Sequence, residues 1–254
     1  MAPYSPLLLL LLSALLPHPT LSIDLIVIGD STASDYNDDP STYPRAGWGM
    51  FLGSHFNPAS GIVVRDAAAA GRSSKSFYDE KLWAQAKSKY LSPGDYVFIQ
   101  FGHNDQKKDS HRHTDPFTSY KKYLTFYVKE TRAAGGNPVL LTPISRAVWH
   151  KGTLEQTLGD YPTAMRQLAA QLRVPLLDMN TATSALFSKL GEKATQNNLF
   201  MFLPAGKYPN YPKGVTDKTH LQVAGAKQVA VIVAQAITKA NLPIAAYVQS
   251  SDLV

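Results

Sequence analysis

Short apolar runs alternate along the chain with longer stretches that have helical spacing. The apolar runs predict strands over residues 23–28, 62–65, 96–101, 138–142 and 174–178. The spacing of apolar positions predicts helices over residues 48–56, 77–90, 115–134, 161–172, 181–190 and 223–240. Near-continuous apolar strands separated by helices are typical of a parallel sheet covered on both faces. We therefore predict an α/β fold, a three-layer α/β/α flavodoxin-like sandwich with a five-stranded parallel sheet.

The N-terminus has a different pattern. Residues 7–16 read LLLLLLSALL, and residues 1–22 contain no Asp, Glu, Lys or Arg. This apolar stretch has the length of a secretory signal core and is too short to span a bilayer as a helix. We expect a signal peptide over residues 1–22 with cleavage near Ser22, and a single membrane anchor or a buried helix is the alternative. A single domain over residues 23–254 would then be secreted to the extracellular space, with no membrane attachment.

Composition narrows the class of protein. The chain is 44% hydrophobic and 17% charged, which suits a globular domain and not a disordered chain. The lack of cysteine excludes disulfides, Cys-ligated metal and a thiol nucleophile. The net charge of +6 is compatible with nucleic acid, a membrane or an acidic polymer as a partner. No basic stripe or nucleic-acid motif is apparent, so we expect no nucleic-acid partner.

Small and polar residues follow the predicted strands. In a doubly wound sheet, ligands bind beyond the carboxyl ends of the strands. Ser31 follows the first strand in GDST (29–32), Gly71 follows the second, and Asn104 follows the third in GHND (102–105). Asp217 and His220 lie three apart in a predicted loop before the last helix. Each segment taken alone also fits a structural turn, a helix cap or a chance spacing.

Together these segments supply the groups that a serine nucleophile needs. Ser31 would attack, His220 would accept its proton, and Asp217 would orient the imidazole. The backbone N–H groups of Ser31 and Gly71 and the Asn104 side chain would form the oxyanion hole. His103 is also near, but we interpret it as a packed or hydrogen-bonded loop histidine.

Several longer blocks resemble a known family. GDST (29–32), AAAAGRSSKSF (67–77), QFGHND (100–105) and DKTH (217–220) resemble the SGNH, or GDSL-like, hydrolase superfamily. AGWG (46–49), GDYVFIQFGHND (94–105) and TPISR (142–146) resemble its rhamnogalacturonan acetylesterase group. The resemblance implies the SGNH hydrolase fold, removal of acetyl groups from pectin, and no metal or organic cofactor. It assigns the four eponymous positions to Ser31, Gly71, Asn104 and His220.

Four further side chains are candidate substrate contacts. Arg72 and Arg146 flank strand ends and could pair with the uronate carboxylates of pectin, although pairing within the protein is as compatible with the sequence. Trp48 and Trp149 could contact sugar rings, and Trp48 could instead pack under the first strand. His111 and His113 lack a third metal ligand, so we interpret them as part of a solvated loop.

The predicted function is that of a secreted esterase, acting as a monomer on an acetylated acidic polysaccharide. Rhamnogalacturonan is the first candidate substrate and acetylxylan is the second. A general short-chain carboxylesterase or lipase of the same fold is an alternative, which would require an apolar acyl pocket. A non-catalytic carbohydrate-binding protein is a further alternative, against which the complete set of site residues argues.

Overall fold

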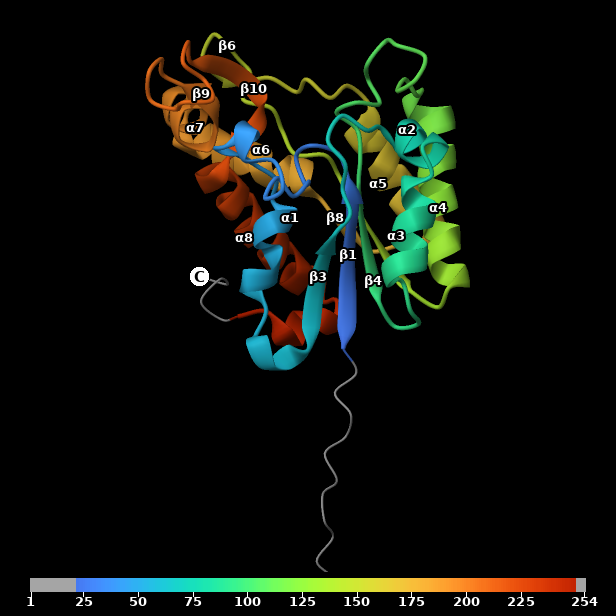
Figure 1. Cartoon of the computed structure of the whole chain (residues 1–254). Helices are drawn as coiled ribbons and strands as arrows, with labels where there is room; N and C mark the ends of the chain where they lie inside the picture. Colours follow the sequence, from blue (N-terminus) through green and yellow to red (C-terminus); the bar gives the residue numbers. More distant parts are fainter. Residues whose placement is uncertain (1–21, 250–254) are drawn as a thin grey trace, which may run out of the picture.

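A parallel sheet forms the centre of the computed structural model, which describes residues 22–249. Its strands are β1 (Ile23–Gly29), β3 (Ile62–Asp66), β4 (Tyr96–Gln100), β5 (Asn137–Leu141) and β8 (Leu176–Leu177). They lie in the order β3-β1-β4-β5-β8, and every pair is parallel (Figure 1). The predicted five-stranded parallel sheet is therefore confirmed. The strand order places β1 between β3 and β4, so the loops after these strands emerge side by side.

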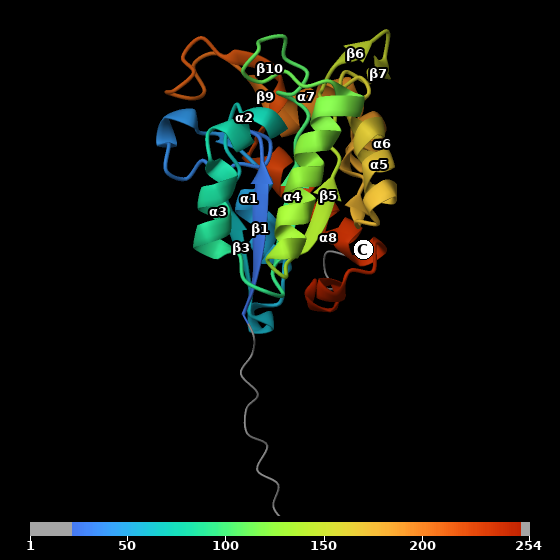
Figure 2. The same ribbon diagram turned by 90° about the vertical axis from the view of Figure 1, so that its right-hand side faces the viewer.

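The strands are mostly apolar, as expected for a sheet that is covered on both faces. Leu25 and Val27 of β1 pack into one core, whereas Ile26 and Ile28 pack into the other. One face carries α2 (Ser74–Asp79), α3 (Leu82–Tyr90), α4 (Lys121–Ala133) and α5 (Tyr161–Leu172) (Figure 1, Figure 2). The other side carries α1 (Gly49–Leu52), α6 (Met179–Leu190), α7 (Glu192–Leu199) and α8 (Val223–Lys239).

Local backbone chemistry explains where the helices begin and end. The helix expected over 77–90 is divided into α2 and α3, because Lys81 adopts a left-handed conformation with φ 63°. The helix expected from residue 115 begins as predicted, with Asp115 accepting hydrogen bonds from the N–H groups of Phe117 and Thr118. Its first turn is a π-helix, η4 (Pro116–Tyr120), which leads into α4. The helix expected over 48–56 shortens to α1 followed by the 3-10 turn η2 (Gly53–His55).

A second, antiparallel sheet lies above the carboxyl ends of the parallel strands (Figure 1). It consists of β2 (Arg45–Ala46), β10 (Val215–Gln222) and β9 (Phe200–Leu203), in that order. The strands β6 (Trp149–His150) and β7 (Thr153–Leu154) form a separate antiparallel hairpin. The remaining 3-10 turns are η1 (Pro40–Thr42), η3 (Pro58–Ser60) and η5 (Pro243–Tyr247). This small sheet and α7 were not predicted from the sequence.

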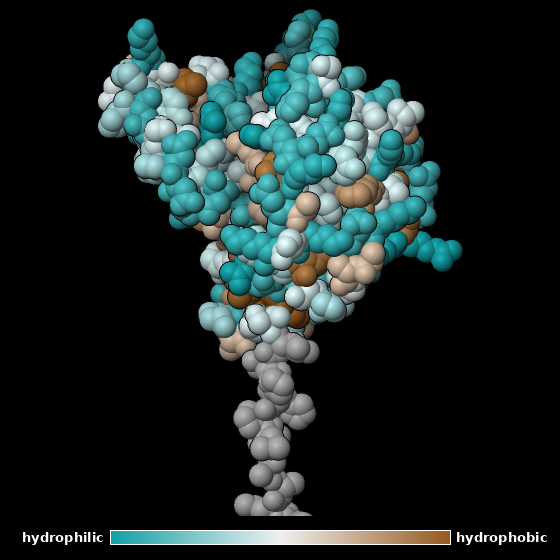
Figure 3. All heavy atoms as spheres, turned by 45° about the vertical axis from the view of Figure 1, so that its right-hand side comes forward, coloured by the Kyte–Doolittle hydropathy of each residue, from teal (hydrophilic) through white to brown (hydrophobic). Residues whose placement is uncertain are grey.

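The outer face of the α2–α4 layer is mostly hydrophilic, and its apolar side chains gather in small separate patches (Figure 3). Within residues 22–249, no helix has the length and apolar character needed to cross a membrane. The predicted signal peptide, apart from Ser22, lies outside the described residues.

Candidate active site

Ser31 occupies a tight turn immediately after β1. The carbonyl of Asp30 accepts hydrogen bonds from the N–H groups of Ala33 (3.1 Å) and Ser34 (3.2 Å), which closes the turn. Gly29 is required at the end of the strand, because a Cβ there would lie 2.7 Å from the carbonyl oxygen of Gln100 on β4. The Ser31 side chain remains 5% exposed at the carboxyl edge of the sheet.

Ser31, His220 and Asp217 form a continuous hydrogen-bonded chain. The Ser31 hydroxyl lies 2.9 Å from Nε2 of His220, and Nδ1 of His220 lies 2.7 Å from Oδ2 of Asp217. The sequence prediction of a loop for Asp217 and His220 is wrong, because both lie on strand β10. The pairing of β10 with β9 shifts between Asp217 and Leu221, and this irregularity allows residues three apart to face one another.

The charge on Asp217 selects the useful tautomer of His220. Burial raises the pKa of Asp217, but hydrogen bonds and charge from His220 and the backbone N–H groups of His220 and Thr219 lower it to about 2. Asp217 is therefore an acceptor only, so Nδ1 of His220 carries a hydrogen in order to donate to it. In neutral His220, Nε2 is then free to accept the hydroxyl proton of Ser31.

The predicted oxyanion donors lie on the loops that flank Ser31. Gly71 follows β3 and has φ 82°, and an added Cβ would meet nothing within 4 Å, so its surroundings are open. Asn104 follows β4 and donates from Nδ2 to the carbonyl of Arg72 at 3.0 Å, which joins the two loops. The amide nitrogen of Asn104 has a second hydrogen that it can donate to an oxyanion, and the bond to Arg72 holds the side chain in place. Their action as oxyanion donors stays a prediction.

A second histidine–aspartate pair lies beneath the site and is fully buried. Nδ1 of His103 lies 3.1 Å from Oδ2 of Asp30, and Nε2 of His103 lies 3.0 Å from the carbonyl oxygen of Ile144. A carbonyl can only accept, so Nε2 donates to it, and a hydrogen bond between Nδ1 and Asp30 then requires a second proton on the pair. Burial lowers the pKa of His103, and the charge and hydrogen bond of Asp30 oppose that effect. Burial raises the pKa of Asp30, but the charge and hydrogen bond of His103 and two donors from Thr32 lower it overall. The interpretation of His103 as a hydrogen-bonded loop histidine is confirmed.

Trp48 belongs to this buried network. Its Nε1 donates to Oε1 of Gln100 at 2.9 Å, and Nε2 of Gln100 donates to the hydroxyl of Thr32 at 2.7 Å. That hydroxyl in turn donates to Asp30 at 2.8 Å. Trp48 is 0% exposed, so the prediction that it contacts substrate is wrong. The packing alternative holds for this side chain.

The two predicted arginine contacts have partners within the protein. Arg72 pairs with Glu80 at 2.8 Å, as the structural alternative expected. Arg146 donates to Thr219 Oγ1 (3.1 Å), Gln106 Oε1 (3.0 Å) and the His103 carbonyl (3.3 Å). Arg146 thus joins the β10 segment that carries His220 to the loop after β4.

One predicted substrate contact, Trp149, and the two histidines of the predicted solvated loop remain. Trp149 is half-buried on β6, packs against the core and stays a candidate for substrate contact. His111 lies 3.3 Å from Glu80, and His113 lies 2.8 Å from the carbonyl of Lys107. Within residues 22–249, no group of three or more His, Cys, Asp or Glu side chains is placed to hold a metal ion.

Sequence reasoning missed three residues that support Ser31 from below or behind. Asp30 and Gln100 connect to it through the network described above. The hydroxyl of Tyr36 donates to the carbonyl of Ser31 at 2.9 Å. Asp30 and Gln100 are polar residues inside or at the end of apolar strands, and this was the available signal. Tyr36 carried no such signal.

The chain is similar to known proteins over most of its length. Residues 27–228 match the model of the GDSL-like lipase/acylhydrolase family. A rhamnogalacturonan acetylesterase of Bacillus subtilis is 38% identical over 231 residues, which is 91% of this chain and 96% of the relative. A probable rhamnogalacturonan acetylesterase of the same organism is 36% identical over 221 residues, 87% of this chain and 94% of the relative.

A solved structure of the Bacillus subtilis protein YXIM is also similar, with a TM-score of 0.73 and 25% identity. The match covers 89% of this chain and 58% of that longer protein. The family match spans most of the chain and includes Ser31, Gly71, Asn104 and His220. The chain therefore belongs to the GDSL-like lipase/acylhydrolase family.

Proposed function

We propose that this chain is a secreted serine esterase that removes O-acetyl groups from rhamnogalacturonan. The observation that carries the proposal is the hydrogen-bonded chain from Ser31 through His220 to Asp217. It occurs in a protein that is 38% identical, over most of its length, to a rhamnogalacturonan acetylesterase. The net charge of +6 supports an acidic polymer as substrate, because it raises the local concentration of polyanions.

The proposed reaction has two steps. Ser31 Oγ attacks the acetyl carbonyl while Nε2 of His220 takes the hydroxyl proton. The tetrahedral intermediate collapses to an acetyl ester of Ser31, and the sugar oxygen leaves with the proton from His220. Water then attacks this ester, with His220 again acting as the base, and acetate is released. Asp217 stabilises the imidazolium that forms in each step.

The negative charge on the intermediate would be held by the N–H groups of Ser31 and Gly71 and by the Asn104 amide. Each such donor supplies about 3–4 kcal/mol of transition-state stabilisation. The open space beside Gly71 supports this assignment, because an oxyanion needs room next to its donor.

The proposal is tested by the release of acetate from acetylated rhamnogalacturonan and from acetylated xylan. We expect faster release from rhamnogalacturonan, and a loss in Ser31→Ala of about 10⁴-fold or more in kcat. Ser54→Ala, which alters an exposed serine on η2, is the matched control and keeps its activity. Activity in Ser31→Ala above a few per cent of wild type would remove Ser31 from the mechanism, and a preference for xylan would reject the substrate.

Secretion is tested separately by sequencing the N-terminus of protein recovered from the medium. We expect the mature chain to begin close to Ile23. Recovery of the protein inside cells with Met1 retained would contradict this part of the proposal.

A further inference from the structure

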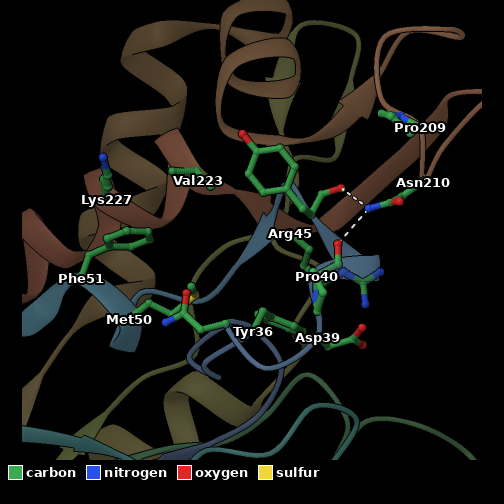
Figure 4. Close-up of a pocket in the computed structure, with 12 residues that line it drawn as sticks. Tyr36, Asp39, Pro40, Arg45, Met50, Phe51, Pro209, Asn210, Val223 and Lys227 are labelled. Atoms are coloured by element: carbon green, nitrogen blue, oxygen red, sulfur yellow. Dashed lines mark hydrogen bonds between the residues drawn. The ribbon is translucent and has the colours of Figure 1, made fainter.

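We propose that a cavity beside the candidate active site is a subsite for a uronate unit, a sugar that carries a carboxylate. This inference rests on the proposed function, because it places part of an acidic polysaccharide next to Ser31. The cavity has a volume of about 600 Å³, within the range of small-molecule sites. Segments far apart in the sequence meet around it (Figure 4), and the lining residues that matter here are Tyr36, Tyr43, Arg45, Phe51, Asn210 and Lys227.

Two cations line this uronate cavity without a carboxylate partner. Lys227 and Phe51 lie at one side and Arg45 at the other (Figure 4). The ammonium of Lys227 lies 5.4 Å from the ring centre of Phe51, and the guanidinium carbon of Arg45 lies 5.9 Å from that of Tyr36. Neither cation takes part in an ion pair with any residue in the described part of the chain. Nε of Arg45 is buried without a hydrogen-bond partner there.

One acidic residue lines the cavity, and its carboxylate is already engaged. Oδ1 of Asp39 accepts hydrogen bonds from the N–H (3.2 Å) and the hydroxyl (2.5 Å) of Ser41, which caps η1. Two cations against one capping carboxylate leave a net positive charge on the lining. Arg45 is partly buried without a counter-ion, which favours an anionic ligand, whereas Lys227 is exposed and adds attraction at longer range. Arginine binds carboxylates in a bidentate manner.

An aromatic surface accompanies these charges. Tyr43 is 57% exposed, more than any other large hydrophobic side chain in residues 22–249. Its ring meets that of Tyr208 edge to face at 6.1 Å, which leaves the ring available to a ligand. Asn210 donates to the carbonyls of Pro40 (2.9 Å) and Tyr43 (3.5 Å) and so fixes this wall of the cavity (Figure 4). An exposed ring beside cations suits a sugar acid, because the ring contacts the apolar face of the sugar while the cations bind its carboxylate.

One hydrogen bond connects a wall of the uronate cavity with the turn that carries Ser31. Tyr36 lines the cavity, and its hydroxyl donates to the carbonyl of Ser31. Burial raises the pKa of Tyr36 to about 12, so this hydroxyl stays protonated and keeps donating. Arg45 pairs through β2 with Gln222 of β10, two residues beyond His220. These two links support the inference that a polysaccharide with an acetyl group at Ser31 places another of its sugars in the cavity.

The test measures binding without turnover. An oligogalacturonate that lacks acetyl groups is titrated into the wild-type protein by calorimetry, and the same oligosaccharide with its carboxyl groups reduced to alcohols is compared. We expect the carboxylate form to bind about tenfold more tightly. Lys227→Gln and Arg45→Gln should each weaken its binding about fivefold. Equal affinity for the two oligosaccharides, or wild-type affinity in Lys227→Gln, would overturn the proposal.

The matched control is Lys89→Gln, because Lys89 also lies over an aromatic ring, 4.9 Å from the centre of Tyr90, outside the cavity. We expect its affinity for the oligogalacturonate to match that of the wild type. A comparable loss in Lys89→Gln would show that general charge attracts the ligand and would overturn the subsite.

Two further measurements keep the inference separate from its alternatives. Amide chemical shifts of Phe51 and Asn210 in the wild-type protein should move on titration with galacturonate, a readout that needs no variant. Octanoate tests an aliphatic carboxylate as the occupant, and tighter binding of octanoate than of the oligogalacturonate would reject a sugar subsite. A protein that binds oligogalacturonate here but releases no acetate from rhamnogalacturonan would refute the proposed function and leave the subsite standing.

Discussion

Two histidine–aspartate pairs lie next to the nucleophile, and the same Asp→Asn substitution should inactivate the enzyme at one pair and be tolerated at the other. In Asp217, Oδ1 accepts the N–H groups of Thr219 (2.8 Å) and His220 (3.0 Å). The amide oxygen of Asp217→Asn must take this place, so its NH₂ group faces Nδ1 of His220. Nδ1 then accepts, Nε2 carries the hydrogen, and His220 can no longer receive the proton of Ser31. We expect kcat to fall about 10⁴-fold, or about 5 kcal/mol in activation free energy.

At Asp30 the same reasoning predicts that His103 carries its hydrogen on Nε2, where it already donates to the carbonyl of Ile144. Oδ1 of Asp30 accepts the N–H (2.9 Å) and hydroxyl (2.8 Å) of Thr32, so the amide oxygen of Asp30→Asn belongs there. Its NH₂ then faces Nδ1 of His103, and Nε2–H of His103 continues to donate to Ile144. All hydrogen bonds are kept with a neutral pair. We expect kcat within about tenfold of wild type and unfolding free energy within about 1 kcal/mol.

The matched variant Asp30→Ala tests whether the fold would tolerate any substitution of Asp30. It leaves His103 and the two donors of Thr32 without their acceptor in a fully buried place. The expected loss of stability is about 3 kcal/mol, measured by urea unfolding. Activity is measured with 4-nitrophenyl acetate, and the histidine tautomers are assigned by ¹⁵N NMR. The reasoning is refuted if Asp217→Asn keeps more than about a tenth of kcat, or if Asp30→Asn is as unstable as Asp30→Ala.

Three other predictions follow from the site. Asn104→Ala should lower kcat about 10²–10³-fold without a change in thermal unfolding, and a loss under threefold would remove Asn104 from the oxyanion hole. Burial raises the pKa of Asp105 from 3.8 to about 6, so its contribution to stability is complete below about pH 4 and is lost as the pH rises to 6. Relative to Asp105→Asn, the wild type should lose about 2 kcal/mol of unfolding free energy between pH 4 and pH 7, whereas parallel urea midpoints would contradict the shift. Raising NaCl from about 50 to 500 mM should increase the KM for acetylated pectin but not for 4-nitrophenyl acetate, and equal sensitivity would argue against charge-assisted binding.

The parallel sheet was predictable because its strands are buried on both faces and therefore read as unbroken apolar runs. The antiparallel sheet was not, since β10 reads VTDKTHLQ and carries mostly polar, partly exposed residues. A strand with a solvated face and an irregular register has neither a continuous apolar run nor clean alternation. Asp217 and His220 were therefore recognised by their motif, while the strand that holds them was assigned as a loop.

The candidate site residues were predictable where topology alone places them. Ser31, Gly71 and Asn104 follow strands that turn out to be neighbours, so position in the sequence was enough to bring them to one edge. The roles of Trp48, Arg72 and Arg146 depend instead on which side chain each one meets. Trp48 finds Gln100, 52 residues away, and Arg146 finds Thr219, 73 residues away. No local pattern encodes such pairings.

The buried pair and the candidate residues above it have a common geometric origin. Asp30 directly precedes Ser31, and His103 directly precedes Asn104. In each turn, a residue of the buried pair is thus directly followed by a candidate site residue. The hydrogen bond between Asp30 and His103 thus fixes the turn of β1 to the turn of β4 from below, which holds the nucleophile and its predicted oxyanion donor in one arrangement. Polar groups can therefore occupy the end of an otherwise apolar layer, because Asp30 and His103 pair with each other across two neighbouring strands.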